Sequence, residues 1–214
     1  MRKAPSRYAV QILVVIAALA VLAWPGSADT VFDNTSGTIT SGYVVGTVPT
    51  TTDSYLLSYS FTPTGNFQLD SLGAIVSTLS GGGDPTLSYF LYADSGGEPG
   101  AVLESWTGVT VPSTVTLETV VATSDIILAA GQQYWFGVTT DISTDSAVWW
   151  INPAGDTSTA CDTVNAGPFD CSTINATAAF QISGTAVPEP GALSMLCAGL
   201  LGCLGLAQRR LRRS

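Results

Sequence analysis

The basic residues of this chain lie only at its two ends. No Lys or Arg stands between Tyr8 and Gln208, and the chain contains no His. Fifteen of the sixteen acidic residues lie between Asp29 and Asp170. A domain built from this middle segment cannot form salt bridges between side chains, so its carboxylates must be hydrogen-bonded, solvated or bound to an external cation.

The same absence excludes several kinds of function. Without His, Lys or Arg, the middle segment cannot hold a Ser-His-Asp triad, a Cys-His dyad, a Schiff-base lysine, an arginine clamp or a zinc ion bound by imidazole. Nothing in it neutralises phosphate, so nucleic acid and anionic membrane surfaces are poor partners. We expect no cofactor.

The N-terminus has the organisation of a secretory signal peptide. A positive segment, residues 1–7, precedes an apolar run, residues 8–24. Small residues at Gly26 and Ala28 occupy the positions that a signal peptidase reads, which predicts cleavage after Ala28 and a mature chain that begins at Asp29. An uncleaved signal anchor is the alternative. In both cases the residues that follow are exported.

Residues 29–186 form the predicted exported domain, and their pattern indicates an all-β fold. Residues 55–62 alternate apolar and polar side chains with a period of two, as in a strand with one buried face. Gly and Pro between the apolar runs supply turn conformations. This spacing favours an antiparallel β-sandwich, jelly-roll-like. The expected strands are residues 55–62, 66–69, 71–79, 86–93, 101–106, 115–122, 133–140, 147–151 and 178–184, and residues 152–175 are expected to be a loop.

The C-terminal residues 187–214 have three parts in a fixed order. The motif Pro188-Glu189-Pro190 is followed by an apolar run, residues 192–207, and then by an arginine cluster. A helix over the apolar run would rise about 24 Å, less than the hydrocarbon core of a bilayer at about 30 Å, so the span is marginal. The arginines predict a cytoplasmic stop signal, with the exported domain on the far side. They are Arg209, Arg210, Arg212 and Arg213.

This arrangement resembles the PEP-CTERM sorting signal of Gram-negative bacteria. The resemblance implies that an exosortase, a membrane-embedded cysteine transpeptidase, recognises residues 187–214 and cuts near Pro188-Glu189-Pro190. It implies a precursor anchored in the inner membrane that later reaches the cell surface or the extracellular matrix, in association with exopolysaccharide. A C-terminal membrane anchor that is never processed is the alternative.

A second resemblance concerns the exported domain. Residues 91–100 and 128–136, taken together, are similar to the choice-of-anchor β-domains, which are exported bacterial domains that occur with different surface-anchoring signals. The resemblance spans about residues 30–185. It implies a surface role without known catalytic activity.

Cys161 and Cys171 lie in the predicted exported domain, ten positions apart. An oxidising compartment favours a disulfide between them. A reactive thiol pair is the alternative, although no neighbouring cation or His is available to lower a thiol pKa.

Two adjacent tryptophans, Trp149 and Trp150, lie in a predicted strand. Neighbours in a strand point to opposite faces, so one is expected inside and the other outside, where it would stack on a sugar ring. The alternative is that both are covered. Trp106 and Trp135 are expected in the core, with Tyr134 pointing outward.

The acidic residues leave two further alternatives. Oxygen ligands suit a structural calcium ion, but no calcium-binding motif selects its ligands from the loop aspartates, which are Asp84, Asp94, Asp141, Asp145, Asp156, Asp162 and Asp170. Two carboxylates alone can hydrolyse a glycoside, but no spacing selects a pair from Glu98, Glu104, Glu118 and the aspartates. We therefore expect a non-catalytic exported protein, with a carbohydrate-binding module and a glycoside-active enzyme as alternatives.

Overall fold

The computed structural model describes residues 28–187, apart from 38, 40, 49, 80–84, 142–144, 153–157 and 175, and the single residue Gly199. The sorting motif Pro188-Glu189-Pro190, the arginine cluster and nearly all of the predicted signal peptide lie outside these residues.

The described residues form fourteen strands, and every paired strand is antiparallel to its partner. The expected all-β antiparallel fold is therefore confirmed. The strands are β1 (Ala28–Asp33), β2 (Gly42–Thr47), β3 (Ser54–Phe61), β4 (Phe67–Thr78), β5 (Thr86–Asp94), β6 (Pro99–Thr110), β7 (Thr116–Val121), β8 (Ile127–Leu128), β9 (Tyr134–Thr140), β10 (Ser146–Asn152), β11 (Ser158–Val164), β12 (Asp170–Ile174), β13 (Thr177–Ala178) and β14 (Phe180–Ala186).

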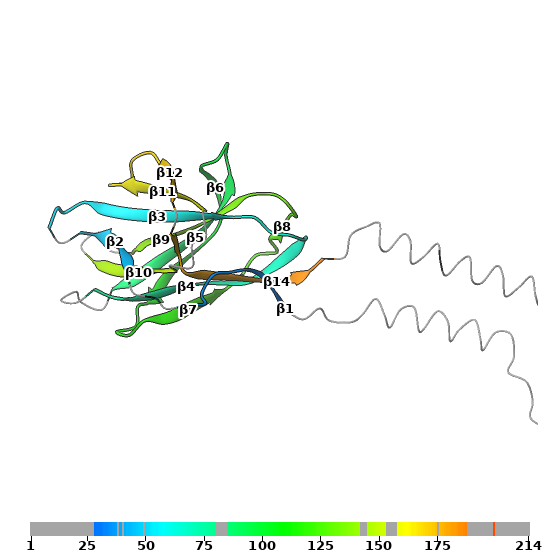
Figure 1. Cartoon of the computed structure of the whole chain (residues 1–214), viewed down its shortest axis with the longest axis horizontal. Coiled ribbons are helices and arrows are strands. Elements are labelled where there is room, and N and C mark those ends of the chain that lie inside the picture. Colours follow the sequence, from blue (N-terminus) through cyan, green and yellow to red (C-terminus); the bar gives the residue numbers. More distant parts are fainter. Residues whose placement is uncertain are drawn as a thin grey trace, which may run out of the picture.

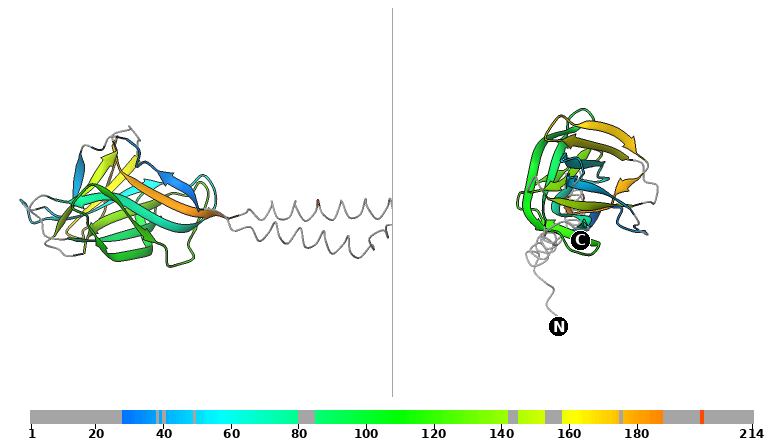
Figure 2. Two further views of the ribbon diagram at one scale, coloured as in Figure 1. Left: turned by 90° about the horizontal axis from the view of Figure 1, so that it is seen from below. Right: turned by 90° about the vertical axis from the view of Figure 1, so that its left-hand side faces the viewer.

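The strands follow one hydrogen-bonded path, β1-β14-β4-β10-β2-β3-β9-β5-β6, that curls into two facing layers (Figure 1). One layer contains β1, β14, β4 and β10, with β7 and β8 beside β4. The other contains β3, β9, β5 and β6, and the β11–β12 hairpin extends it beyond β3. Viewed along the long axis, the strands surround a common core (Figure 2). The first and last strands, β1 and β14, are paired neighbours, so the described chain begins and ends at the same place.

The core is an aromatic cluster that joins the two layers. Trp149 of β10 meets Tyr59 of β3 edge-on, with ring centroids 5.0 Å apart, and meets Phe136 of β9 at 5.4 Å. Phe180 of β14 lies 5.6 Å from Phe136 and 6.2 Å from Phe61. Such tilted and edge-to-face contacts stabilise a core beyond the burial of apolar area alone.

Several expected strands are confirmed, among them β3, β5, β9 and β10. Residues 66–69 and 71–79, expected as two strands, form the single strand β4. Tyr134 was expected to point outward, and this is wrong: it is 4% exposed, because its ring packs in the core against Phe61, with ring centroids 5.8 Å apart, and its hydroxyl accepts a hydrogen bond from the Ala129 backbone N–H. Residues 152–175, expected to be a loop, contain β11 and β12. No strand was expected where β1 and β2 lie.

Candidate functional site

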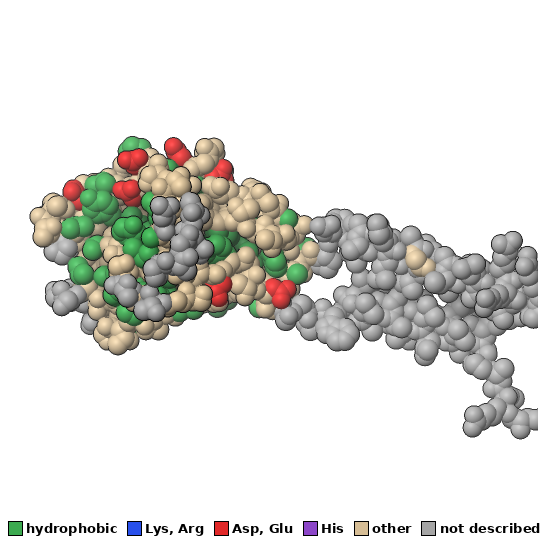
Figure 3. Space-filling view, in the orientation of Figure 1, with side chains coloured by type: hydrophobic (Ala, Val, Ile, Leu, Met, Phe, Trp, Pro, Cys, Tyr) green, Lys and Arg blue, Asp and Glu red, His purple; other side chains and the backbone are tan. Residues whose placement is uncertain are grey.

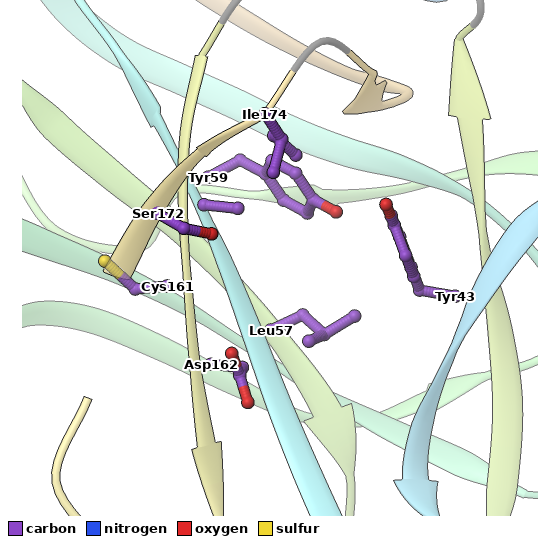
Figure 4. A pocket seen from close by; sticks show the side chains of 8 residues that line it. Tyr43, Leu57, Tyr59, Cys161, Asp162, Ser172 and Ile174 are labelled. Atoms are coloured by element: carbon purple, nitrogen blue, oxygen red, sulfur yellow. The ribbon is translucent and has the colours of Figure 1, made fainter. Parts of the chain in front are cut away.

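A cavity of about 190 Å³ opens where β2, β3 and the β11–β12 hairpin meet (Figure 4). We call it the Tyr43 cavity. Its lining combines aromatic, aliphatic and polar side chains, namely Tyr43, Leu57, Tyr59, Ala160, Cys161, Asp162, Ser172 and Ile174.

The strand register explains why the lining side chains of β3, β11 and β12, other than that of Cys161, share one face. Asp162 of β11 lies opposite Leu57 of β3, and Ala160 lies opposite Tyr59 on one side and Ser172 of β12 on the other. Residues directly opposite in an antiparallel pair point to the same face of the sheet. This face continues into the core, because Leu57, Ala160 and Ile174 pack against the main cluster of buried residues. The cavity is thus an opening at the edge of the core.

The opening exists because β2 leaves β3 at Gly46. Strand β2 pairs with β3 only at Gly46 and Thr47, and it pairs with β10 from Gly42 to Gly46. Gly46 has φ +81°, and a Cβ atom there would lie 2.5 Å from the backbone oxygen of Asp145. Only glycine fits such a position without strain. The divergence places Tyr43 on one wall of the cavity and β3 on the other.

Tyr59 is a buried residue whose hydroxyl lines this cavity. The residue is 1% exposed, and none of the described residues forms a hydrogen bond with its hydroxyl. Among the described residues, the buried side-chain atoms without a partner are Ser58 Oγ and Glu104 Oε2; the Tyr59 hydroxyl is not one of them, so water can reach it through the opening. Burial, followed by the proximity of Tyr43 and Asp162, raises the pKa of Tyr59 well above its ordinary value, so the hydroxyl stays neutral.

Asp162 supplies the charge at this site. Burial is the larger cause that raises the pKa of its carboxyl group, and the neighbouring Asp170 is the second. Asp170 lies directly opposite Asp162 in the hairpin. None of the described side chains donates a hydrogen bond to Asp162. Acidic side chains also lie scattered along the edge of the domain where β6, β11 and β12 are found (Figure 3).

The opposite face of the same hairpin is closed by the expected disulfide, which is present between Cys161 and Cys171. The two cysteines are directly opposite in the β11–β12 pair. They pack with Trp135 of β9, Tyr92 of β5 and Phe169, and Trp135 is fully buried as expected. Its indole N–H donates to Asp94 at 2.9 Å. This bond connects the two segments, residues 91–100 and 128–136, on which the second resemblance depends.

The predicted stacking residues do not form an exposed platform. Trp149 is 0% exposed, and its indole N–H donates to the Ala179 backbone oxygen at 3.0 Å. It is therefore a core residue, and a stacking role for it is wrong. Trp150 is half-buried, and its N–H donates to Ser77 at 2.9 Å. The exposed aromatic side chain at the cavity is instead Tyr43. It lies opposite Trp149 in the β2–β10 pair and is 39% exposed.

Sequence reasoning missed Tyr43 and Tyr59, and it considered Asp162 only as one of many loop aspartates. A period-two pattern places Tyr59 on the inner face of β3, but nothing in the sequence shows which inner-face residue meets an opening. Residues 41–47 do contain two valines beside Tyr43, a short run that could have been interpreted as a strand.

Several other carboxylates bind the backbone of this domain. Glu104 is buried, and its Oε1 accepts hydrogen bonds from the backbone and hydroxyl of Thr123. Asp141 accepts from the Gly108 N–H at 2.6 Å and from the Ser88 hydroxyl. Within the described ranges, no three acidic or cysteine side chains gather where they could hold a metal ion. Asp84 and Asp156 lie outside those ranges.

Comparison with known protein families finds a match that begins at Ala186, the last residue of β14. Residues 186–213 match the PEP-CTERM protein-sorting motif. The match includes Pro188-Glu189-Pro190 and all four arginines of the cluster. The PEP-CTERM motif makes this chain an exported protein with a membrane-anchored precursor that an exosortase processes.

No curated protein matches the chain. The likeness of residues 30–185 to the choice-of-anchor β-domains stays a prediction. Among the described residues, no helix is long and apolar enough to cross a membrane.

Proposed function

We propose that the exported domain is a non-catalytic component of the cell surface or the extracellular matrix, and that it associates there with exopolysaccharide. The observation that carries this proposal is the PEP-CTERM motif at residues 186–213, attached directly to a β-domain that has no Lys, Arg or His between Asp29 and Ala186. Because β1 and β14 are neighbours, the start of the mature chain and the sorting motif lie at one end of the domain.

The positions of the carboxylates support a non-catalytic role. Glycoside hydrolysis needs an acid and a nucleophile or base on the two sides of the scissile bond. Asp162 and Asp170 are neighbours on one face of one hairpin, so they do not flank a bound sugar. Asp94, Glu104 and Asp141 are hydrogen-bonded to the domain itself.

The carbohydrate-binding alternative is favoured by one specific observation, the Tyr43 cavity. An exposed aromatic ring beside hydroxyl and carboxylate groups is suited to stack on and hydrogen-bond a sugar. A carbohydrate-binding role and a matrix role are compatible, because a matrix component must be retained by some contact.

Intact mass of the protein from its native host, with and without deletion of its exosortase, tests the sorting step. We expect a mature form that lacks the residues beyond about Pro190 in the wild-type strain and a longer form in the deletion strain. A mass that includes the arginine cluster in both strains would contradict processing.

Fractionation of the same cultures tests the matrix role. We expect the mature protein in the exopolysaccharide fraction, and we expect it in the medium when polysaccharide synthesis is blocked. Retention at the surface without polysaccharide would contradict the association and leave the sorting step intact.

A further inference from the structure

The Tyr43 cavity presents four polar groups that have no side-chain hydrogen-bond partner among the described residues, although the Asp162 carboxylate accepts a bond from its own backbone N–H. They are the hydroxyls of Tyr43, Tyr59 and Ser172 and the carboxylate of Asp162. In Figure 4 the hydroxyls of Tyr59 and Tyr43 lie on the same side of the opening, and Asp162 and Leu57 lie across it. A hydroxyl both donates and accepts, whereas a carboxylate only accepts. This set matches a ligand that carries several hydroxyl groups.

The apolar part of the lining fits the other surface of such a ligand. Leu57, Ala160 and Ile174 form an aliphatic floor, and the ring of Tyr43 forms one wall. A sugar ring combines hydroxyl groups at its edge with C–H groups on its faces, and it places the C–H groups against aromatic and aliphatic carbon.

The size of the cavity restricts the ligand to one ring. Its volume of about 190 Å³ is below the range of about 300–1,000 Å³ that sites for drug-sized ligands occupy. A longer molecule would therefore place one unit in the cavity and leave the rest outside.

Charge restricts the ligand further. Asp162 lies opposite Asp170, and the exported domain has no cationic side chain to compensate either one. An anion in this cavity would face the Asp162 carboxylate, with Asp170 as its neighbour in the hairpin and no cationic side chain in the domain to offset the repulsion. A neutral ligand avoids this repulsion, and an ammonium group is attracted.

We propose that the Tyr43 cavity binds one pyranose unit of a neutral or amino-substituted glycan and excludes uronic acids. Tyr43 stacks on a C–H face of the ring, and Tyr59, Asp162 and Ser172 hydrogen-bond its hydroxyl groups. This inference rests on the proposed association with polysaccharide, and it adds the site and the class of sugar.

Direct titration of the full chain tests the proposal. The protein is purified in a detergent whose head group is not a sugar, because a glycoside detergent would compete. The probes are the methyl glycosides of neutral pyranoses, glucosamine and glucuronate, followed by ligand-observed NMR. We expect saturable binding of a neutral pyranose or glucosamine with a dissociation constant of about a millimolar, and at least about tenfold weaker binding of glucuronate. Absence of binding in the whole series, or equal binding of glucuronate, overturns the proposal.

Single-atom variants locate the binding. Tyr59→Phe removes only the unpartnered hydroxyl, so we expect affinity to fall about three- to tenfold without a loss of thermal stability. Asp162→Asn should reduce the discrimination against glucuronate. Tyr55→Phe is the matched control, since Tyr55 lies on the same strand but does not line the cavity, and it should bind like wild type. Unchanged affinity and selectivity in the first two variants overturns the assignment of the site.

The same variants separate this inference from the proposed function. If the Tyr59→Phe and Asp162→Asn proteins lose sugar binding and matrix retention together, both proposals are supported. If matrix retention is normal in variants that no longer bind sugar, the cavity binds sugar but is not the retention site, so the cavity assignment and the proposed function both stand and only the link between them fails. If the wild type binds sugar but is not retained in the matrix, the proposed function fails and the cavity assignment stands.

Discussion

The two faces of the β11–β12 hairpin differ although alternate residues of the same two short strands form them. On the outer face, the disulfide packs beneath Trp135 and Phe169, and the Trp135 N–H has its partner in Asp94. On the inner face, Tyr59 and Asp162 border a cavity and have no hydrogen-bonded side-chain partner among the described residues. Period-two alternation lets one hairpin stabilise the domain with one face and leave the other available for a ligand.

Replacement of an aromatic side chain at each face should give the largest difference in the free energy of unfolding. Trp135→Ala removes a fully buried indole and leaves Asp94 without its donor, so we expect a loss of about 3–5 kcal/mol in the free energy of unfolding. Tyr43→Ala, on the inner face, should cost less than about 1 kcal/mol, because Tyr43 is 39% exposed. Urea denaturation followed by tryptophan fluorescence measures both. Equal losses would mean that the inner face is also structural.

Loss of the disulfide should have the next largest effect. The bond closes a loop with a sequence separation of 10, for which the chain-entropy model gives about 3 kcal/mol. We expect the Cys161→Ser, Cys171→Ser double variant to lose about this much stability. Among the described residues, β12 pairs with β11 alone, so the position of Ser172 at the cavity should become less defined as well. Wild-type protein in reductant is the control, and it should behave like the double variant. A double variant as stable as oxidised wild type would show that strand pairing alone holds the hairpin.

A change at Gly46 tests the point at which β2 diverges from β3 and the cavity opens. Gly46→Ala forces a side chain into the left-handed region and against the Asp145 backbone, so we expect a loss of about 2 kcal/mol. Gly131→Ala is a useful control, because its φ is also positive, at +73°, but nothing lies within 4 Å of an added Cβ atom. Thermal unfolding of the two variants should separate the steric cost from the conformational one. A smaller loss of stability at Gly46 than at Gly131 would contradict the close packing of Gly46 against the Asp145 backbone.

The sequence predicted several strands and the disulfide but not the cavity, for physical reasons. Alternation along residues 55–62 and 133–140 located β3 and β9, and the spacing of Cys161 and Cys171 in an exported segment indicated the disulfide. The hairpin that carries the disulfide was missed, because Gly167 and Pro168 are residues typical of loops. Its strands are fixed by pairing with β3 and by the crosslink rather than by local propensity.

The cavity depends on contacts that no local pattern encodes. Tyr43 and Asp162 are far apart in the sequence and meet only because β2 diverges from β3 while β11 pairs with β3. The same limit explains why the sequence could not show which of the two tryptophans lies inside. Alternation showed that Trp149 and Trp150 face opposite ways, but the inner position belongs to Trp149 because Phe180 and Phe136 pack against it.

The smallest expected changes in stability concern two aspartates whose pKa values shift in opposite directions. The folded-state pKa of Asp162 is raised, by burial and then by Asp170, so the folded protein binds this proton more tightly than the unfolded chain does. The charged form therefore destabilises the fold above that pKa, and the penalty disappears as pH falls toward the ordinary value of 3.8. We expect Asp162→Asn to be slightly more stable than wild type at pH 7, and the difference should vanish in acid.

Asp33 on β1 should behave in the opposite way. Burial acts to raise its pKa, but hydrogen bonds from Thr35 and Gln181 outweigh burial and lower it. Its charged form therefore stabilises the fold above the ordinary value of 3.8, and this contribution is lost as pH falls through the lowered pKa. Asp33→Asn should lower the melting temperature at pH 7 while Asp162→Asn raises it, and both differences from wild type should shrink in acid. Differential scanning fluorimetry from pH 7 to pH 3 measures both differences. A lower melting temperature for Asp162→Asn than for wild type at pH 7 would mean that a contact within the fold stabilises the charged carboxylate, which is then not available to a ligand.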